Sequence, residues 1–152
     1  MNSFITSLDR EFAQLHQRSR ELIDGTRAGW LYRRPGQQAS SGPALSVGEY
    51  VLRSAAAIEQ TFGGLTASLW DDPFEWTLPE SLSTPDKIIA YLDEVEATRT
   101  RGFELLKDDA ELLKEIMSPS GNALLFSLLL DTLVRAAHYL GSAEVTFAAL
   151  RD

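Results

Sequence analysis

The stretch LLDTLVRAAHYLGSAEV, residues 129–145, belongs to a run from Asn122 to about Leu150 that is apolar around most of a helical circumference. A surface helix of a globular protein carries polar residues along one face, whereas a helix that is apolar on most sides is typical of a buried position. We therefore expect this run to be the most enclosed helix of a bundle. It also carries His138, one of only two histidines in the chain.

Three further helices are predicted upstream, because apolar residues recur at steps of three and four. The first ends at Gly25, and the second begins after a capping box of Ser46 and Glu49. The third begins after Thr84, with Pro85 in its first turn. The inward stripes of the three helices are Ile5, Leu8, Phe12, Leu15, Ser19 and Leu22; Val47, Val51, Ser54, Ile58, Phe62, Leu65 and Leu69; and Ile88, Leu92, Val95, Phe103 and Leu106.

The connections between the helices are predicted to differ in length. Residues 26–45 are interrupted by Pro, Gly and Ser, and residues 70–83 contain two prolines and two tryptophans, so both indicate long loops. The link into the fourth helix is expected to be short. Residues 109–117 suggest an extra turn or two, residues 118–121 break the pattern, and no convincing strand is visible. We predict one all-α domain over residues 1–152, a four-helix bundle with a long loop after its first and second helices, in which a crossover joins some neighbours.

Composition excludes several classes of partner. A formal net charge of −8 opposes the binding of nucleic acids and anionic membranes, and no apolar run approaches the roughly 20 residues of a membrane span. The chain has no cysteine, and its first residues lack the basic and apolar segments of a signal peptide. We therefore expect a soluble protein of the cytoplasm that binds neither nucleic acid nor membrane.

Three segments carry a resemblance to a known family. They are LSVGEYVLRSAA (residues 45–56), TPDKIIAYLDEVEATRTRGFELL (residues 84–106) and the 129–145 stretch, in which Gly141 fixes the register. Over nearly its full length the chain resembles the DinB/YfiT-like superfamily of bacterial four-helix proteins. The resemblance implies a four-helix bundle and suggests a homodimer that forms through a helix face or the aromatic loops.

The resemblance also locates a metal site that this chain has altered. In relatives that bind metal, the ligands are one histidine of the second helix and two of the fourth, and these positions hold Arg53, Arg135 and Tyr139 here. His138 lies next to the last position, about 100° around the helix, and points elsewhere. Because guanidinium groups stay protonated and repel cations, we predict no bound metal and no cofactor.

Two interpretations of these arginines stay open. In the first, Arg53 and Arg135 converge in the inherited cavity, with Tyr139 at its wall, and bind a small carboxylate or phosphate through their planar forks. In the second, each arginine is neutralised by the acid one turn earlier, Glu49 for Arg53 and Asp131 for Arg135.

Other candidate side chains have structural alternatives. His138 shares the Asp131 side of the fourth helix, and Arg99 is expected to join either an ion-pair network or the pocket. His16 is expected at the edge of its helical stripe, as a surface or hydrogen-bonded histidine rather than as half of a two-histidine metal site with His138. Four aromatic residues are interpreted as loop anchors rather than as the lining of a ligand groove: Trp30, Trp70, Phe74 and Trp76.

Two classes of function follow. We favour a non-catalytic bundle that binds a small molecule or dimerises. The alternative is a thiol-dependent transferase or isomerase of the kind the resemblance implies, which works without metal or with an atypical metal site. It would use Arg53, Arg135, Tyr139 and His138 as electrostatic and proton-transfer groups. The sequence does not name the substrate.

Overall fold

The computed structural model describes residues 3–36, 45–73 and 77–151. Within these ranges the chain forms mainly four long helices, which confirms the predicted all-α four-helix bundle. The helices are α1 (Ser3–Asp24), α2 (Val47–Ala67), α3 (Pro85–Glu104) and α4 (Leu125–Arg151). Two short 3₁₀ segments, η1 (Ala28–Trp30) and η3 (Asp109–Leu113), lie in the connections.

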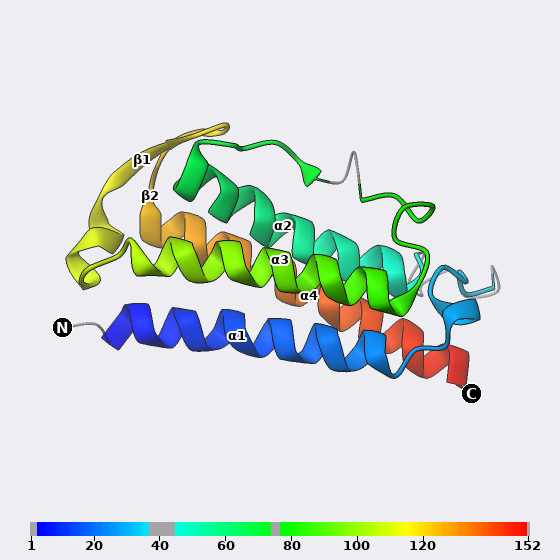
Figure 1. Ribbon diagram of the computed structural model, residues 1–152. Helices are drawn as coiled ribbons and strands as arrows, with labels where there is room; N and C mark the ends of the chain where they lie inside the picture. Colours follow the sequence, from blue (N-terminus) through cyan, green and yellow to red (C-terminus); the bar gives the residue numbers. More distant parts are fainter. Residues whose placement is uncertain (1–2, 37–44, 74–76, 152) are drawn as a thin grey trace.

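The order of the helices in space differs from their order in the chain. α1 packs against α3 and α4, and α2 packs against the same two helices, so α1 and α2 lie diagonally across the bundle (Figure 1). α2 and α3 run in the same direction, so the chain between them returns along the length of the bundle (Figure 1). This connection is the predicted crossover. None of the described helices is long and apolar enough to span a membrane.

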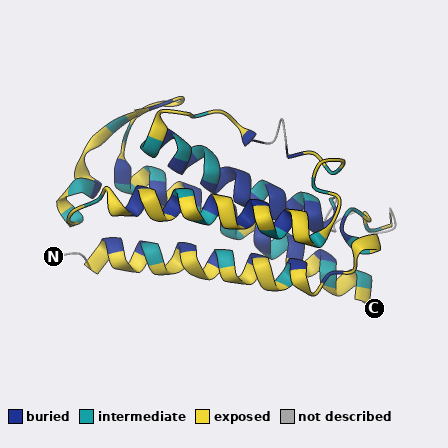
Figure 2. Cartoon of the chain, viewed as in Figure 1, coloured by how far each residue is buried: buried dark blue, intermediate teal, exposed yellow. Residues whose placement is uncertain are grey.

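The core lies where the inward stripes of the helices meet. The rings of Phe12, Phe62 and Phe103 come from three helices and contact one another, with centroids 5.3 to 5.9 Å apart. The buried faces of the helices turn toward this centre, while the outer faces of α1 and α3 are exposed (Figure 2). The predicted stripes therefore identify most of the core, although Leu69 lies beyond the end of α2 and is exposed.

The expectation that the fourth helix is the most enclosed one is wrong. Thirteen of the 21 residues of α2 are buried, whereas seven of the 27 residues of α4 are. The buried residues of α2 include alanines and a serine beside larger apolar residues. These small side chains allow α4 to pack closely against α2, which increases the burial of α2. The additional apolar residues of α4 face outward, among them Leu130, Val134 and Val145.

The predicted helix starts at α2 and α3 are confirmed. The Ser46 hydroxyl accepts a hydrogen bond from the Glu49 backbone N–H at 3.2 Å, and the Glu49 carboxylate accepts one from the Ser46 N–H at 2.8 Å. This reciprocal pair satisfies backbone donors that the first turn of a helix leaves open. The Thr84 hydroxyl caps α3 by accepting from the Lys87 N–H at 3.3 Å.

The link into α4 is neither short nor free of strands, contrary to the prediction. After η3 the chain forms an antiparallel hairpin of β1 (Glu115–Ser118) and β2 (Gly121–Leu124). Gly121 adopts a φ of 109°, which favours glycine, and the Ser118 hydroxyl donates to the Gly121 carbonyl at 2.8 Å. Because β2 occupies the residues just before Leu125, α4 begins three residues later than the predicted Asn122.

Candidate functional site

The structure brings Arg53, Arg135 and Tyr139 together at one pocket between α2 and α4. The pocket has a volume of about 130 Å³, so it suits only a small chemical group. Ala56 and Ala57 of α2 also line it, and their short side chains leave room for the longer ones from α4. Arg53, Arg135 and Tyr139, which one interpretation of the sequence expects to converge, therefore line a single pocket.

A second, wider pocket of about 400 Å³ adjoins the first, since Gln60 and Arg135 line both. Its wall on one side is the tip of the hairpin, and on the other it is the segment that follows α2. Its remaining lining residues are Thr61, Trp70, Ser118, Pro119, Ser120, Leu128 and Asp131. We call the two pockets together the α2–α4 cleft. The missed hairpin is thus part of the candidate site.

The segment after α2 is held in place by close packing. The ring of Trp70 lies directly over Gly64, where an added Cβ would come within 2.2 Å of the indole. The Gln60 side-chain amide donates to the Trp70 carbonyl at 3.0 Å. Glycine is therefore required at this position if Trp70 is to form the wall of the cleft.

Beneath the cleft, neutral hydroxyl groups join α2 to α4. The Thr61 and Thr132 hydroxyl oxygens are 2.6 Å apart, and Thr132 donates its proton to the Leu128 carbonyl at 2.9 Å. Since a hydroxyl has one proton, Thr61 is the donor to Thr132. Ser54 likewise donates to the Ala136 carbonyl at 2.8 Å. These buried polar groups are satisfied without any charge.

The predicted pair between Asp131 and Arg135 is confirmed, with a separation of 3.3 Å from the arginine Nε to a carboxylate oxygen. Both side chains are largely exposed, at 65% and 44%, so this pair is weak and leaves the rest of the Arg135 guanidinium open to other acceptors. Arg53 is half-buried and takes part in an interaction of its own. A further carboxylate, that of Asp72, lines the narrow pocket with both arginines.

In the described contacts, the Glu49 carboxylate binds groups other than Arg53, which departs from the second interpretation of the sequence. Its carboxylate accepts from the Arg34 guanidinium at 2.7 Å and from the Ser46 backbone and hydroxyl. Burial alone raises the pKa of Glu49, but these hydrogen bonds outweigh it and hold the pKa below its ordinary value. The capping role of Glu49 draws its carboxylate to the start of α2, away from the cleft.

Arg99 belongs to an ion-pair network between α1 and α3 and does not line the cleft. Its side chain is 4% exposed and is paired with Asp9 and with Glu96, whose carboxylate accepts from the Arg99 Nε at 3.0 Å. Burial alone would lower the pKa of Arg99, but the two carboxylates raise it above its ordinary value. The guanidinium also lies 5.4 Å from the centroid of the Phe103 ring.

The two histidines do not line the cleft and have different neighbours. His138 is exposed, with its ring 5.7 Å from that of Tyr139, while the Nε2 of His16 lies 3.4 Å from a carboxylate oxygen of Asp93. His16 is therefore a partly buried histidine beside an acid of α3. Among the described residues, no group of three or more acidic or histidine side chains is arranged to hold a metal ion.

A partly buried acid–phenol pair joins α2 to α3 near the crossover segment. The Tyr91 hydroxyl donates to the Glu59 carboxylate at 2.5 Å. Burial raises the pKa of Glu59, and the charge of Glu94 raises it further, although the bond from Tyr91 lowers it. Burial and the Glu59 carboxylate also raise the pKa of Tyr91, so the phenol stays protonated.

The aromatic residues of the loops are only partly described. Trp70 acts as an anchor over Gly64 and as a wall of the cleft, so both roles weighed for it apply. Trp30 is half-buried, with the Arg27 guanidinium 4.9 Å from the centroid of its ring. Phe74 and Trp76 lie outside the described residues.

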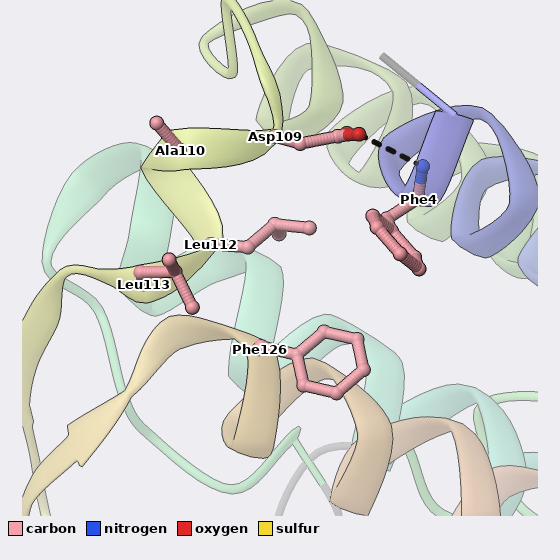
Figure 3. Close-up of a pocket in the computed structure, with 6 residues that line it drawn as sticks. All are labelled: Phe4, Asp109, Ala110, Leu112, Leu113 and Phe126. Atoms are coloured by element: carbon pink, nitrogen blue, oxygen red, sulfur yellow. Dashed lines mark hydrogen bonds between the residues drawn. The ribbon is translucent and has the colours of Figure 1, made fainter. Parts of the chain in front are cut away.

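A third pocket, of about 350 Å³, differs from the cleft in that its lining is apolar (Figure 3). It is found where the N-terminus of α1, η3 and the N-terminus of α4 meet, and it is almost entirely apolar. Its carboxylate, Asp109, accepts from the backbone N–H groups of Phe4 and Ile5 at 3.2 and 3.0 Å. This acid caps α1 and is therefore occupied. The lining residues drawn in Figure 3 are Phe4, Asp109, Ala110, Leu112, Leu113 and Phe126.

The fold and the cleft define an all-α four-helix protein with two arginines and a tyrosine at a pocket between helices. No family model matches the chain, and neither a curated protein nor a solved structure is significantly similar to it.

Proposed function

We propose that the chain is a divergent member of the DinB/YfiT-like superfamily that binds a small anionic molecule, a carboxylate or a phosphate, without a bound metal. The observation that carries this proposal is the shared pocket of Arg53 and Arg135, which come from α2 and α4. Two guanidinium groups at one small pocket favour an anion, because each can donate two parallel hydrogen bonds to it.

The surroundings of the arginines support binding rather than a purely structural role. Arg135 is held by one exposed acid, so an incoming anion displaces little. Tyr139 lines the same pocket and supplies a hydroxyl that can donate a hydrogen bond to the anion. The neutral hydroxyl pairs below the cleft hold α2 and α4 together independently of the arginines. Binding and folding therefore depend on different groups.

The proposal is tested by calorimetric titration of the purified protein with inorganic phosphate and with sodium propionate. We expect saturable binding that Arg53→Gln and Arg135→Gln each weaken at least about tenfold, since a hydrogen bond to a charged group contributes roughly 1.5–3 kcal/mol. Arg101→Gln, an exposed arginine on α3, is the matched control and should bind as the parent does. Binding of neither anion, or equal binding by all variants, would rule the proposal out.

Thermal-shift measurements separate the remaining alternatives. An anion present at about 100 times its Kd stabilises the folded state by about 2.7 kcal/mol and raises the Tm. Stoichiometric metal on the purified protein would contradict the metal-free assignment. A rise in Tm with small thiols, but with neither anion, would favour the transferase alternative instead.

We also propose that a second copy of the chain covers the outer face of α4. Three apolar residues, Leu130, Val134 and Val145, are 43%, 60% and 58% exposed and lie on one side of this helix. Gly141, between them, has open space around it, so another helix could approach closely. Sedimentation of the parent should give a dimer mass that Val134→Glu reduces to that of a monomer; a monomeric parent would contradict this part of the proposal.

A further inference from the structure

We propose that the ligand of the α2–α4 cleft is a zwitterion of the amino-acid type, with one carboxylate, one ammonium group and an apolar side chain. The inference rests on the proposed function, because it specifies the ligand of the same site. It comes from the balance of charges in the cleft and from the shape of its two parts.

The charges that line the cleft are balanced. Arg53 and Arg135 supply two positive charges, and Asp72 and Asp131 supply two negative ones. Asp72 lines the narrow pocket together with both arginines, so an anion bound there lies close to a carboxylate. A doubly charged anion such as phosphate would be repelled most by this acid. A ligand that carries its own ammonium group converts the repulsion into attraction.

The two parts of the cleft differ in what they accommodate. The narrow pocket of about 130 Å³ has room for the charged end of an amino acid, with its carboxylate toward the arginines and its ammonium toward Asp72. The adjoining pocket of about 400 Å³ is walled by Trp70, Pro119 and Leu128, which suit an apolar or aromatic side chain. Arg135 lines both parts and so lies where the two ends of such a ligand meet.

Three ligands that share one phenyl ring isolate the contribution of each charge. L-phenylalanine has both charges, 3-phenylpropionate has only the carboxylate, and 2-phenylethylamine has only the ammonium group. We expect calorimetry at neutral pH to give a Kd for L-phenylalanine that is about tenfold or more below the Kd of 3-phenylpropionate or 2-phenylethylamine. This difference corresponds to one additional charge-assisted hydrogen bond. Equal affinities of L-phenylalanine and 3-phenylpropionate would overturn the inference.

Variants of two neighbouring acids locate the ammonium site. Asp72→Asn should bring the affinities of L-phenylalanine and 3-phenylpropionate to within about twofold, because the acid that distinguishes them is gone. Asp71→Asn, an exposed neighbour that does not line the cleft, should keep the parent's preference. A preference that survives Asp72→Asn would place the ammonium elsewhere and contradict the proposal. The comparison of ligands on the parent protein decides the matter even if Asp72→Asn does not fold.

Two controls separate this inference from the proposed function and from the third pocket. If phosphate or 3-phenylpropionate binds through the arginines while L-phenylalanine has no advantage, the inference fails and the proposed function stands. If no ligand binds in an arginine-dependent way, both fail. Because a phenyl ring also fits the apolar pocket of Figure 3, Leu113→Asn, which alters that pocket alone, must leave the affinities unchanged.

Discussion

Arg99 and Arg135 lie at different helix interfaces of the bundle, and they differ in how fully acidic partners compensate their charge. Arg99 is 4% exposed between α1 and α3 and has two carboxylate partners, whereas Arg135 is 44% exposed at the α2–α4 cleft and has one exposed partner. Arg99 therefore has a structural role. Arg135 retains hydrogen-bond donors that can bind a ligand. The number and burial of the neighbouring acids therefore distinguish a structural arginine from one that can bind a ligand.

The largest expected effect comes from removing the buried arginine. Arg99→Met keeps much of the stem volume but leaves Asp9 and Glu96 without their cation. Breaking a fully buried pair costs about 3–5 kcal/mol, and since both acids are partly exposed we expect a loss of about 2 kcal/mol in the free energy of unfolding. Urea denaturation measures this loss. Arg101→Met on the same helix is the control; equal stabilities of the two variants would remove the contrast drawn between Arg99 and Arg135.

The next effect tests whether neutral groups bind α2 to α4. Thr132→Val leaves the buried Thr61 hydroxyl without its acceptor and should cost about 1–2 kcal/mol. Thr146 is equally buried on α4, and among the described contacts its hydroxyl bonds only within this helix. Thr146→Val therefore measures how much stability is lost with the hydrogen bond within α4 alone. The double variant Thr61→Val with Thr132→Val should cost less than the sum of the two single changes. Strict additivity would mean that the two hydroxyls are not coupled.

A smaller effect depends on pH and concerns the pair between α2 and α3. Because burial raises the pKa of Glu59 in the folded state, this residue contributes stability below its ordinary pKa, and the contribution is lost as the pH rises through the raised value. Glu59→Gln keeps an acceptor for Tyr91 but has no charge. We expect it to be more stable than the parent at pH 7, by less than the Arg99 variant loses, and the advantage to vanish at acidic pH.

Thermal unfolding between pH 3 and pH 8 checks this sign. Glu104→Gln, an exposed acid at the end of α3, serves as the control for a simple change in net charge. A Glu59→Gln variant whose stability parallels that of the parent at every pH would show that burial does not disfavour the Glu59 charge.

The smallest expected change in stability comes from Arg135→Gln. Its pair with Asp131 is exposed, and such pairs contribute about 0–1 kcal/mol. The melting temperature should therefore stay close to that of the parent while anion binding is lost. A large drop in stability would mean that Arg135 is as structural as Arg99.

Sequence periodicity predicted the helices well, because buried stripes and caps are local features. The stripe of α1 and the caps at Ser46 and Thr84 occur where expected. The hairpin was missed because each strand has only four residues and their burial does not alternate clearly. Only Gly121 and Pro119 signalled a turn. Apolar composition also misled for α4, since it does not distinguish a core face from an exposed one.

The site could be predicted in part. Arg53 and Arg135 line one pocket with Tyr139, as one interpretation of the sequence expected. Trp70 was considered as a groove residue, but Asp72 could not be foreseen at the site, because the path of the crossover segment does not follow from helical periodicity. Glu49 was weighed as a partner of Arg53, but its carboxylate caps α2 and binds Arg34, which are local contacts.

The cap that Asp109 provides has a consequence for how the chain is made. The carboxylate accepts a hydrogen bond from the backbone of Phe4, 105 residues earlier, so the first turn of α1 is capped by a side chain that leaves the ribosome much later. Until then the first N–H groups of α1 have no such acceptor. The first turn of α1 therefore reaches its final structure only after Asp109 has been synthesised.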